Sequence, residues 1–137
     1  MKLAGRVALV TGGAGGLGGA IALGAAEAGA AVAILDVTGV DEAVAHLHSL
    51  GFKAAGRTVD VRDAKAVASA VESLAAELGP IDTLIAAAGG SLGTPRDLDD
   101  ISEDDLDLVL DVNIKGTFHC ARAVLPFMRQ AGRGAII

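Results

Sequence analysis

A run of glycines directly after a short apolar segment constrains the fold of this chain more than any other feature. The apolar residues 7–10 lead into Thr11, and the glycine-rich residues 12–19 then lead straight into a helical pattern. Glycine at a strand-to-helix turn permits positive φ, lets the backbone approach a phosphate, and allows close packing of the helix on the strand. The exposed amides at the helix start would meet an anion there. The segment therefore predicts a pyrophosphate-binding turn for a dinucleotide, formed by Gly12, Gly15, Gly16, Leu17 and Gly18.

The glycines fit two overlapping sequence motifs, and one alternative explanation competes with them. Gly13, Gly15 and Gly18 fit G-x-G-x-x-G, whereas Gly12, Gly16 and Gly18 fit G-x-x-x-G-x-G. Because the chain holds 19 glycines, a chance match in a plain glycine-rich turn is the alternative. The position directly after the first apolar run favours the pyrophosphate turn. No Gly-Lys-Ser or Gly-Lys-Thr follows, so a nucleoside triphosphate is the poorer ligand.

Apolar runs of strand length alternate with longer amphipathic stretches along the chain, as in parallel βαβ units. The pattern predicts strands at residues 6–11, 31–36, 54–59, 81–86 and 134–137, and helices at 16–28, 41–50, 63–78 and about 102–131. Gly29, Gly51 and Gly79 stop the first three helices, and Ser102 with Asp105 starts the fourth like a capping box. Right-handed crossovers imply the strand order 3-2-1-4-5. We therefore predict one domain over residues 1–137, an α/β Rossmann-type doubly wound parallel sheet with helices on both faces.

Composition limits the partners and the chemistry. A net charge of −6 argues against nucleic acid or an anionic membrane as a partner, since both reward clustered Lys and Arg. No apolar run reaches the roughly 18 residues of a membrane span and no signal-peptide pattern opens the sequence, so we expect a cytoplasmic protein. Cys120 is the only cysteine, which excludes an internal disulfide. His46, His48 and His119 are scattered, so neither a metal site nor a hydrolase triad is expected.

Two acidic residues at predicted strand ends point to the adenosine half of a dinucleotide. Asp36 closes the second strand about 20 residues past the glycine motif, where a carboxylate can bind the adenosine ribose hydroxyls. It would repel a 2′-phosphate, and no Lys or Arg lies in the glycine turn or beside Asp36 in the sequence, so NAD is favoured over NADP. Asp60 and Val61 end the third strand and could cover the adenine. An ordinary turn aspartate is an almost equal alternative for Asp60.

Several elements occur in a recognisable order: Thr11-Gly12-x-x-x-Gly16-x-Gly18, Asp36, Asp60-Val61, Ala86-Ala-Ala-Gly89 and Asn113. In this order they resemble the short-chain dehydrogenase/reductase family over essentially the whole chain. The resemblance implies an oxidoreductase that moves hydride between a nicotinamide and an alcohol or carbonyl. The family usually carries Asn-Asn-Ala-Gly or Asn-Ala-Ala-Gly at the fourth strand, so Ala86 and Ala87 depart from it, which affects local stabilisation more than cofactor binding. Ala88 and Gly89 remain candidates for the ribose–nicotinamide side.

The resemblance also assigns Asn113 as the family's catalytic asparagine, which holds a proton-relay water. Without the resemblance, a helix irregularity or a satisfied polar residue in a groove is the simpler interpretation, because Asn is unfavourable within a helix. Lys115 is not the family's catalytic lysine, which follows a tyrosine by four positions, and the chain has no tyrosine. The family's Ser, Tyr and Lys follow the fifth strand. We therefore expect a chain that is truncated before them and inactive alone.

The apolar face of the last helix is expected to be core: Val109, Val112, Val124, Leu125 and Met128. The resemblance adds a dimer interface along this helix, so a homo-oligomeric parent enzyme with a small-molecule alcohol or ketone substrate is expected. Two function classes remain open. One is the cofactor-binding portion of an NAD-dependent oxidoreductase, and the other is a non-catalytic dinucleotide-binding or partner-binding module that acts as it stands.

Overall fold

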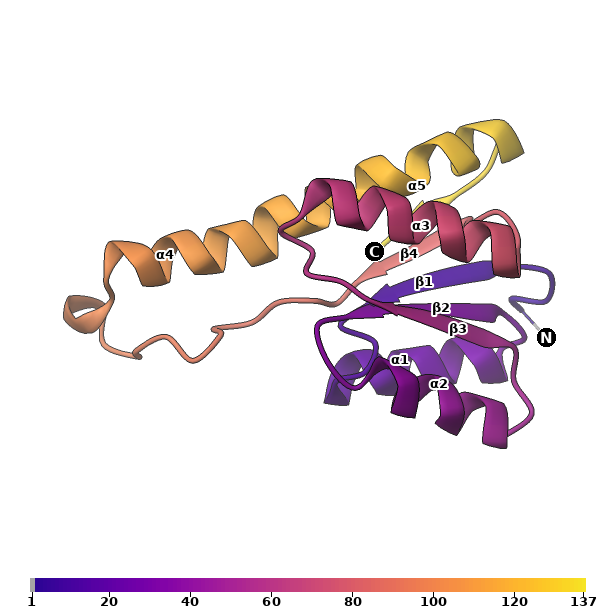
Figure 1. Cartoon of the computed structure of the whole chain (residues 1–137), viewed down its shortest axis with the longest axis horizontal. Coiled ribbons are helices and arrows are strands. Elements are labelled where there is room, and N and C mark those ends of the chain that lie inside the picture. The colour runs from indigo at the N-terminus through magenta and orange to yellow at the C-terminus, as the bar shows by residue number, and fades with distance from the viewer. Residues whose placement is uncertain (1) are drawn as a thin grey trace.

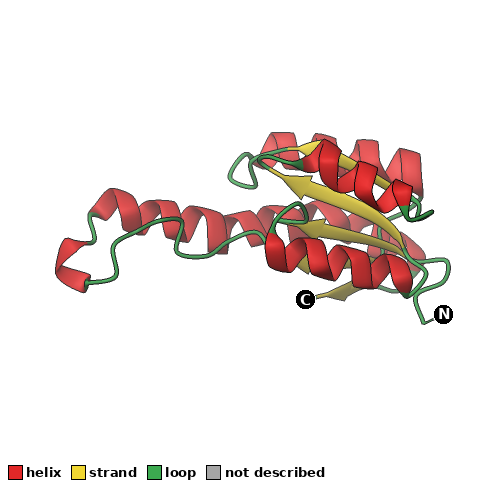
Figure 2. Cartoon of the chain, turned by 90° about the horizontal axis from the view of Figure 1, so that it is seen from below, coloured by secondary structure: helices red, strands yellow, loops and turns green. Residues whose placement is uncertain are grey.

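The computed structural model describes residues 2–137 and has three layers, with a parallel sheet between two layers of helices. The sheet has five strands in the order β3-β2-β1-β4-β5, as predicted. Figure 1 shows α1 and α2 on one face of the sheet and α3 and α5 on the other. The same layers are visible when the molecule is turned (Figure 2). The predicted doubly wound Rossmann-type architecture is thus confirmed.

All five predicted strands form, and four of them are shorter than predicted. Their bounds are Val7–Thr11 (β1), Ala31–Asp36 (β2), Ala54–Thr58 (β3), Thr83–Ala86 (β4) and Ala135–Ile136 (β5). In the register, Thr11 lies beside Leu35 of β2 and Ala86 of β4, so the last residue of β1 is central in the sheet. The prediction that β4 begins at Ile81 was wrong. Asp82 precedes the ladder and directs its carboxylate to Arg6 and Arg133 instead.

The first three helices also match the prediction to within one residue at each end. They are Gly16–Glu27 (α1), Val40–Ser49 (α2) and Ala64–Leu78 (α3). The predicted stops have the expected backbone, because Gly29, Gly51 and Gly79 all have positive φ, which L-residues rarely adopt.

The long fourth helical region is continuous but not uniform, unlike the prediction. It comprises Glu103–Leu110 (α4), a π-helical turn at Asp111–Gly116, and Thr117–Ala131 (α5). The predicted capping box is present: Ser102 Oγ accepts from Asp105 N at 3.1 Å and the Asp105 carboxylate accepts from Ser102 N at 3.0 Å. A short 3-10 helix at Leu98–Asp100 precedes α4, and neither element contains a buried residue. In Figure 1 they form an arm that projects beyond the sheet.

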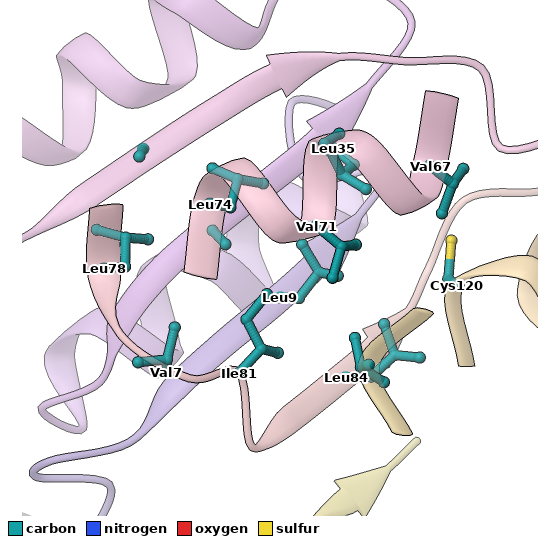
Figure 3. Packing of buried hydrophobic residues seen from close by; sticks show 14 of the residues in the cluster. Val7, Leu9, Leu35, Val67, Val71, Leu74, Leu78, Ile81, Leu84 and Cys120 are labelled. Atoms are coloured by element: carbon teal, nitrogen blue, oxygen red, sulfur yellow. The ribbon is translucent and has the colours of Figure 1, made fainter. Parts of the chain in front are cut away.

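Alternate residues of the central strands belong to opposite faces of the sheet, as the two-residue period of a strand requires. In β1, Leu9 packs in the core beneath α3 and α5, whereas Ala8 and Val10 pack against α1 and α2. Figure 3 shows Leu74 and Val71 of α3 above Leu9. Burial on both faces explains why these strands read as continuous apolar runs.

The expected core face of the last helix is only partly correct. Cys120, Val124 and Met128, spaced four residues apart, are buried in the cluster beneath α3, and Val112 packs at its edge. Val109 and Leu125 lie only half-buried and outside both core clusters. The π-helical turn at residues 111–116 lies between Val109 and the residues of α5, so a regular 3.6-residue period cannot assign the faces on both sides of the turn.

The two-sided core predicts a matched pair of leucine truncations. Leu9 is fully buried and Leu98 is 82% exposed. We expect Leu9→Ala to lower the free energy of unfolding by about 2–5 kcal/mol, because it removes buried methyl groups and leaves a cavity. The control Leu98→Ala should change it by less than about 0.5 kcal/mol. Urea denaturation followed by circular dichroism measures both values, and similar losses in the two variants would contradict this core.

Candidate functional site

The predicted site residues come together at the carboxyl ends of the strands, around the point where the strand order reverses. The chain leaves β1 toward β2 on one side and β4 packs on the other side of β1. Open parallel α/β sheets bind ligands in the crevice at such a switch point. The glycine turn follows β1, Asp36 ends β2, Asp60 and Val61 follow β3, and Ala88 and Gly89 follow β4.

The glycine turn depends on close backbone contacts that a side chain would block. Gly12 has φ +67°, and a Cβ there would lie 3.0 Å from Ala87 O and from Ala88 Cα. A Cβ on Gly18 would collide with the carbonyl of Gly12. The first turn of α1 is thereby seated directly on the end of β1. Gly16 is different, because no atom lies within 4 Å of the position that its Cβ would take.

The N-terminus of α1 has unpaired amides at the carboxyl ends of the strands, where the glycine turn lies. The first helical hydrogen bond runs from Gly19 N to Gly15 O at 2.7 Å, so the amides of residues 16–18 lack a carbonyl within the helix. No side chain caps this terminus in the described chain, and its first turn holds no acidic residue. Leu17 beside these amides is 75% exposed. This geometry suits a phosphate group, which would accept from the amides and complement the helix dipole.

Asp36 connects the end of β2 to the glycine turn. Its Oδ2 accepts from Ala14 N at 3.0 Å, and its Oδ1 accepts from Val37 N at 2.8 Å. The side chain is therefore held in one orientation at the rim of the turn. An ionised carboxylate has about four acceptor sites, so two remain for the hydroxyls of a ligand.

A cavity of about 260 Å³ continues from Asp36 across the ends of β2 and β3. Its wall includes Gly12, Asp36, Asp60, Val61 and Ala88, which are five of the predicted site residues. The sequence did not point to the remaining wall residues, which are Leu35, Val37, Val59, Arg62, Leu92, Leu108 and Val112. Arg62 could have been found from the sequence, because it directly follows the predicted site residues Asp60 and Val61. Leu92 comes from the loop after β4, Leu108 from α4 and Val112 from the π-helical turn.

Asp60 forms an ion pair with Arg62. Arg62 lines the same cavity as Asp36, so Asp36 has no basic neighbour in the sequence but shares its cavity with one in the fold. Arg62 Nε donates to Asp60 Oδ2 at 2.9 Å and Arg62 Nη2 donates to the same oxygen at 2.6 Å. The hydrogen bond from Arg62 holds the pKa of Asp60 below its ordinary value. The cavity wall thus contains two carboxylates, Asp36 and Asp60, and one guanidinium, that of Arg62. The local charge stays negative, which disfavours an additional phosphate.

Ala88 and Gly89 are fixed from two directions. Ala88 N donates to Thr11 Oγ1 at 3.0 Å, so a buried hydroxyl at the end of β1 anchors the turn after β4. Gly89 lies against Asn113, whose Oδ1 occupies the space that a Cβ at residue 89 would need. Sequence analysis placed Thr11 at the start of the glycine motif but did not predict this anchoring bond.

Asn113 lies in the π-helical turn and its side-chain amide is fully engaged. Its Oδ1 accepts from Gly90 N at 2.9 Å, while its Nδ2 donates to Gly90 O at 3.0 Å and to Val109 O at 2.9 Å. The main-chain carbonyl of Asn113 accepts from Thr117 Oγ1 at 2.9 Å. The helix irregularity and the satisfied polar contact are therefore both present. They explain how an unfavourable residue is accommodated within a helix and bring Asn113 to the Ala88-Gly89 turn.

Other kinds of site have little support in the described residues. Burial raises the pKa of the Cys120 thiol to about 11, so it stays protonated and is a poor nucleophile at neutral pH. Residues 2–137 contain no group of three or more His, Cys, Asp or Glu side chains arranged to hold a metal. Over the same residues, no helix has the length and apolar character for a membrane crossing. A larger hollow of about 650 Å³ between α3 and α5 has one ionisable residue in its wall, Glu72.

Comparison with known proteins assigns the class. Residues 6–137 match the family described as short chain dehydrogenase, so the chain belongs to this family. It is 39% identical over 136 residues to 2-dehydro-3-deoxy-L-rhamnonate dehydrogenase (NAD(+)) of Sphingomonas sp. (strain SKA58), covering 99% of this chain and 53% of that protein. It is 40% identical over 138 residues to D-threitol dehydrogenase of Mycolicibacterium smegmatis, covering 99% and 52%.

Solved structures agree with this assignment. NAD+-bound xylitol dehydrogenase superposes with a TM-score of 0.93 at 36% identity, over 99% of this chain and 53% of the other. Gluconate 5-dehydrogenase from Burkholderia cenocepacia J2315, in complex with NADP and tartrate, gives 0.89 at 35% identity, over 98% and 53%. The chain therefore spans about half the length of the relatives that it matches.

The glycine contacts predict opposite outcomes for two alanine substitutions in one turn of helix. Gly18→Ala should lower the free energy of unfolding by about 1–3 kcal/mol, because its Cβ would collide with the Gly12 carbonyl. Gly16→Ala has free space and helical φ, so it should leave stability unchanged or raise it by up to about 1 kcal/mol. Thermal unfolding compares the two. Equal stability of both variants would show that the turn is not seated as described.

Proposed function

We propose that this chain is the NAD-binding portion of a short-chain dehydrogenase/reductase that oxidises an alcohol or reduces a carbonyl compound. The observation that carries the proposal is the open N-terminus of α1, set beside a cavity with Asp36 at its rim. The residues present fit a dinucleotide. Glycine at position 12 permits a positive φ and a close approach to the Ala87–Ala88 backbone that a Cβ would block, and the amides of residues 16–18 are unpaired within the helix. When bound, the nicotinamide would accept or donate the hydride.

Each predicted site residue at the carboxyl ends of the strands has a proposed role in holding this cofactor. The amides of Gly16, Leu17 and Gly18 would bind the pyrophosphate, with Gly12 and Gly15 allowing its approach. Asp36 would accept from the adenosine ribose hydroxyls, and Asp60 and Val61 would border the adenine. Ala88 and Gly89 would contact the ribose on the nicotinamide side. Asn113, already bonded to Gly90 beside them, would serve the proton relay of the complete enzyme.

NAD is proposed over NADP on electrostatic grounds. A 2′-phosphate on the adenosine ribose would meet the Asp36 carboxylate, and the guanidinium of Arg62 is already paired with Asp60. Two negative charges about 4 Å apart at the protein surface repel by about 1–4 kcal/mol. The relatives do not decide the question, since their names include both an NAD(+)-dependent enzyme and an NADP complex.

The proposed parent enzyme is a cytoplasmic homo-oligomer with a small alcohol or ketone substrate. Relatives named for L-rhamnonate-derived, threitol and cyclohexanol substrates support a hydroxyl-bearing small molecule. An exposed apolar row on the last helical region, Leu106, Leu110, Ile114 and Phe118, supports an interface between subunits. The alternative of a non-catalytic dinucleotide-binding or partner-binding module rests on the lack of tyrosine in this sequence.

Cofactor preference can be measured directly on this chain. By isothermal titration calorimetry, we expect NAD to bind at least about tenfold more tightly than NADP. Asp36→Asn should narrow the difference, because the substitution removes the charge that repels the 2′-phosphate. Asp41→Asn, at an exposed position in the first turn of α2, is the matched control and should leave the preference unchanged. Tighter binding of NADP by the unmodified chain would overturn the role given to Asp36.

Catalysis is expected to need residues that this sequence lacks. The family's general acid is a tyrosine phenol, and the chain has none. The purified chain mixed with NAD and a panel of secondary alcohols should therefore form no NADH above a protein-free control, as measured by absorbance. Reproducible NADH formation would refute this. The coding sequence after Ile137 separates the two function classes: a Ser followed by Tyr-x-x-x-Lys supports the enzyme, and a stop codon supports the module.

A further inference from the structure

A histidine from α5 reaches the segment after β3 that borders the proposed adenine site. His119 Nδ1 lies 2.9 Å from the carbonyl oxygen of Val61, a residue 58 positions earlier in the chain. A carbonyl oxygen only accepts, so the hydrogen lies on Nδ1 and the ring donates. His119 does not line the cavity itself. Any effect on a ligand in the cavity therefore passes through Val61.

The peptide unit between Val61 and Arg62 is held at both ends. Its carbonyl accepts from His119, and its amide, Arg62 N, donates to Asp60 Oδ1 at 2.9 Å. A peptide group is planar, so two bonds on opposite sides fix its rotation about the chain axis. This rotation sets the directions of the side chains of Val61 and Arg62, both of which form the cavity wall.

The side chain of Val61 is confined by the same helical region. Val61 is 6% exposed, and a Cβ on Gly116 would lie 2.5 Å from its Cγ2. The helix therefore approaches Val61 closely only because residue 116 is glycine. Three residues before Gly116, Asn113 bonds to Gly90, which lies in the turn after β4. One stretch of helix thus contacts the turns after both β3 and β4.

From these contacts we infer that His119 is a positioning residue for the adenosine side of the cofactor site, acting through the carbonyl of Val61. The inference rests on the proposed function, since it requires that a dinucleotide binds in the cavity. Without the bond, the Val61–Arg62 peptide would be held only through its amide, and the cavity wall would have to be ordered further when the ligand binds. That ordering costs conformational entropy and weakens affinity.

The test compares His119→Leu with His119→Asn, because the amide nitrogen of Asn occupies nearly the position of Nδ1. Loss of one hydrogen bond should weaken NAD binding by about three- to tenfold in His119→Leu, whereas His119→Asn should stay within about twofold of the unmodified chain. AMP should lose affinity by the same factor as NAD, because it contains only the adenosine end. His46→Leu, a histidine outside this contact, is the matched control and should bind both ligands normally.

The possible results separate the inference from the proposed function. If the unmodified chain binds neither NAD nor AMP, the proposed function fails. If it binds both and His119→Leu binds them equally well, the inference fails while the function stands. The inference also fails if Asn does not restore affinity, or if NAD alone is affected. Thermal unfolding identifies a variant that does not fold, and in that case His119→Gln, which shifts the amide by one carbon, replaces His119→Leu and should show the same loss.

Discussion

The contact between the first turn of α1 and the end of β1 is the constraint on which the rest of the site depends. Gly18 lies so close to the Gly12 carbonyl that no side chain fits between them. This close contact places the unpaired amides of α1 at the carboxyl ends of the strands. Asp36 then bonds to Ala14 and joins the end of β2 to the same turn. A phosphate site and a carboxylate for ribose hydroxyls are therefore parts of one backbone arrangement.

The helical region after β4 holds this arrangement from the other side of the sheet. Its π-helical turn brings Asn113 to Gly90, and its next turn brings His119 to Val61. Polar side chains within helices usually weaken them, but here each one satisfies a main-chain group of a neighbouring turn. The irregular helix is therefore a structural support for two loops that regular backbone pairing leaves free.

Much of the fold could be predicted from sequence because it is encoded locally. Strand and helix periods, glycine stops and the Ser102–Asp105 capping box each involve residues close together in the chain. The same holds for the glycine turn and for Asp36, whose spacing marks the end of β2. A helix irregularity at Asn113 was one interpretation of the sequence, but its π-helical form and its tertiary contact could not be predicted in this way. Within the π-helical turn, Asn113 bonds to Gly90, and nothing in residues 111–116 alone indicates that contact.

By itself, the sequence determined the order of elements, the parallel sheet, the glycine-lined turn and the acidic residue beyond it, because hydrophobic period and backbone freedom are properties of short segments. Only the tertiary structure decided the cavity wall and the partners of its charges. Leu92, Leu108 and Arg62 meet there from separate parts of the chain. Their meeting depends on crossovers and on how the projecting arm returns to the sheet, and packing of the whole chain sets both.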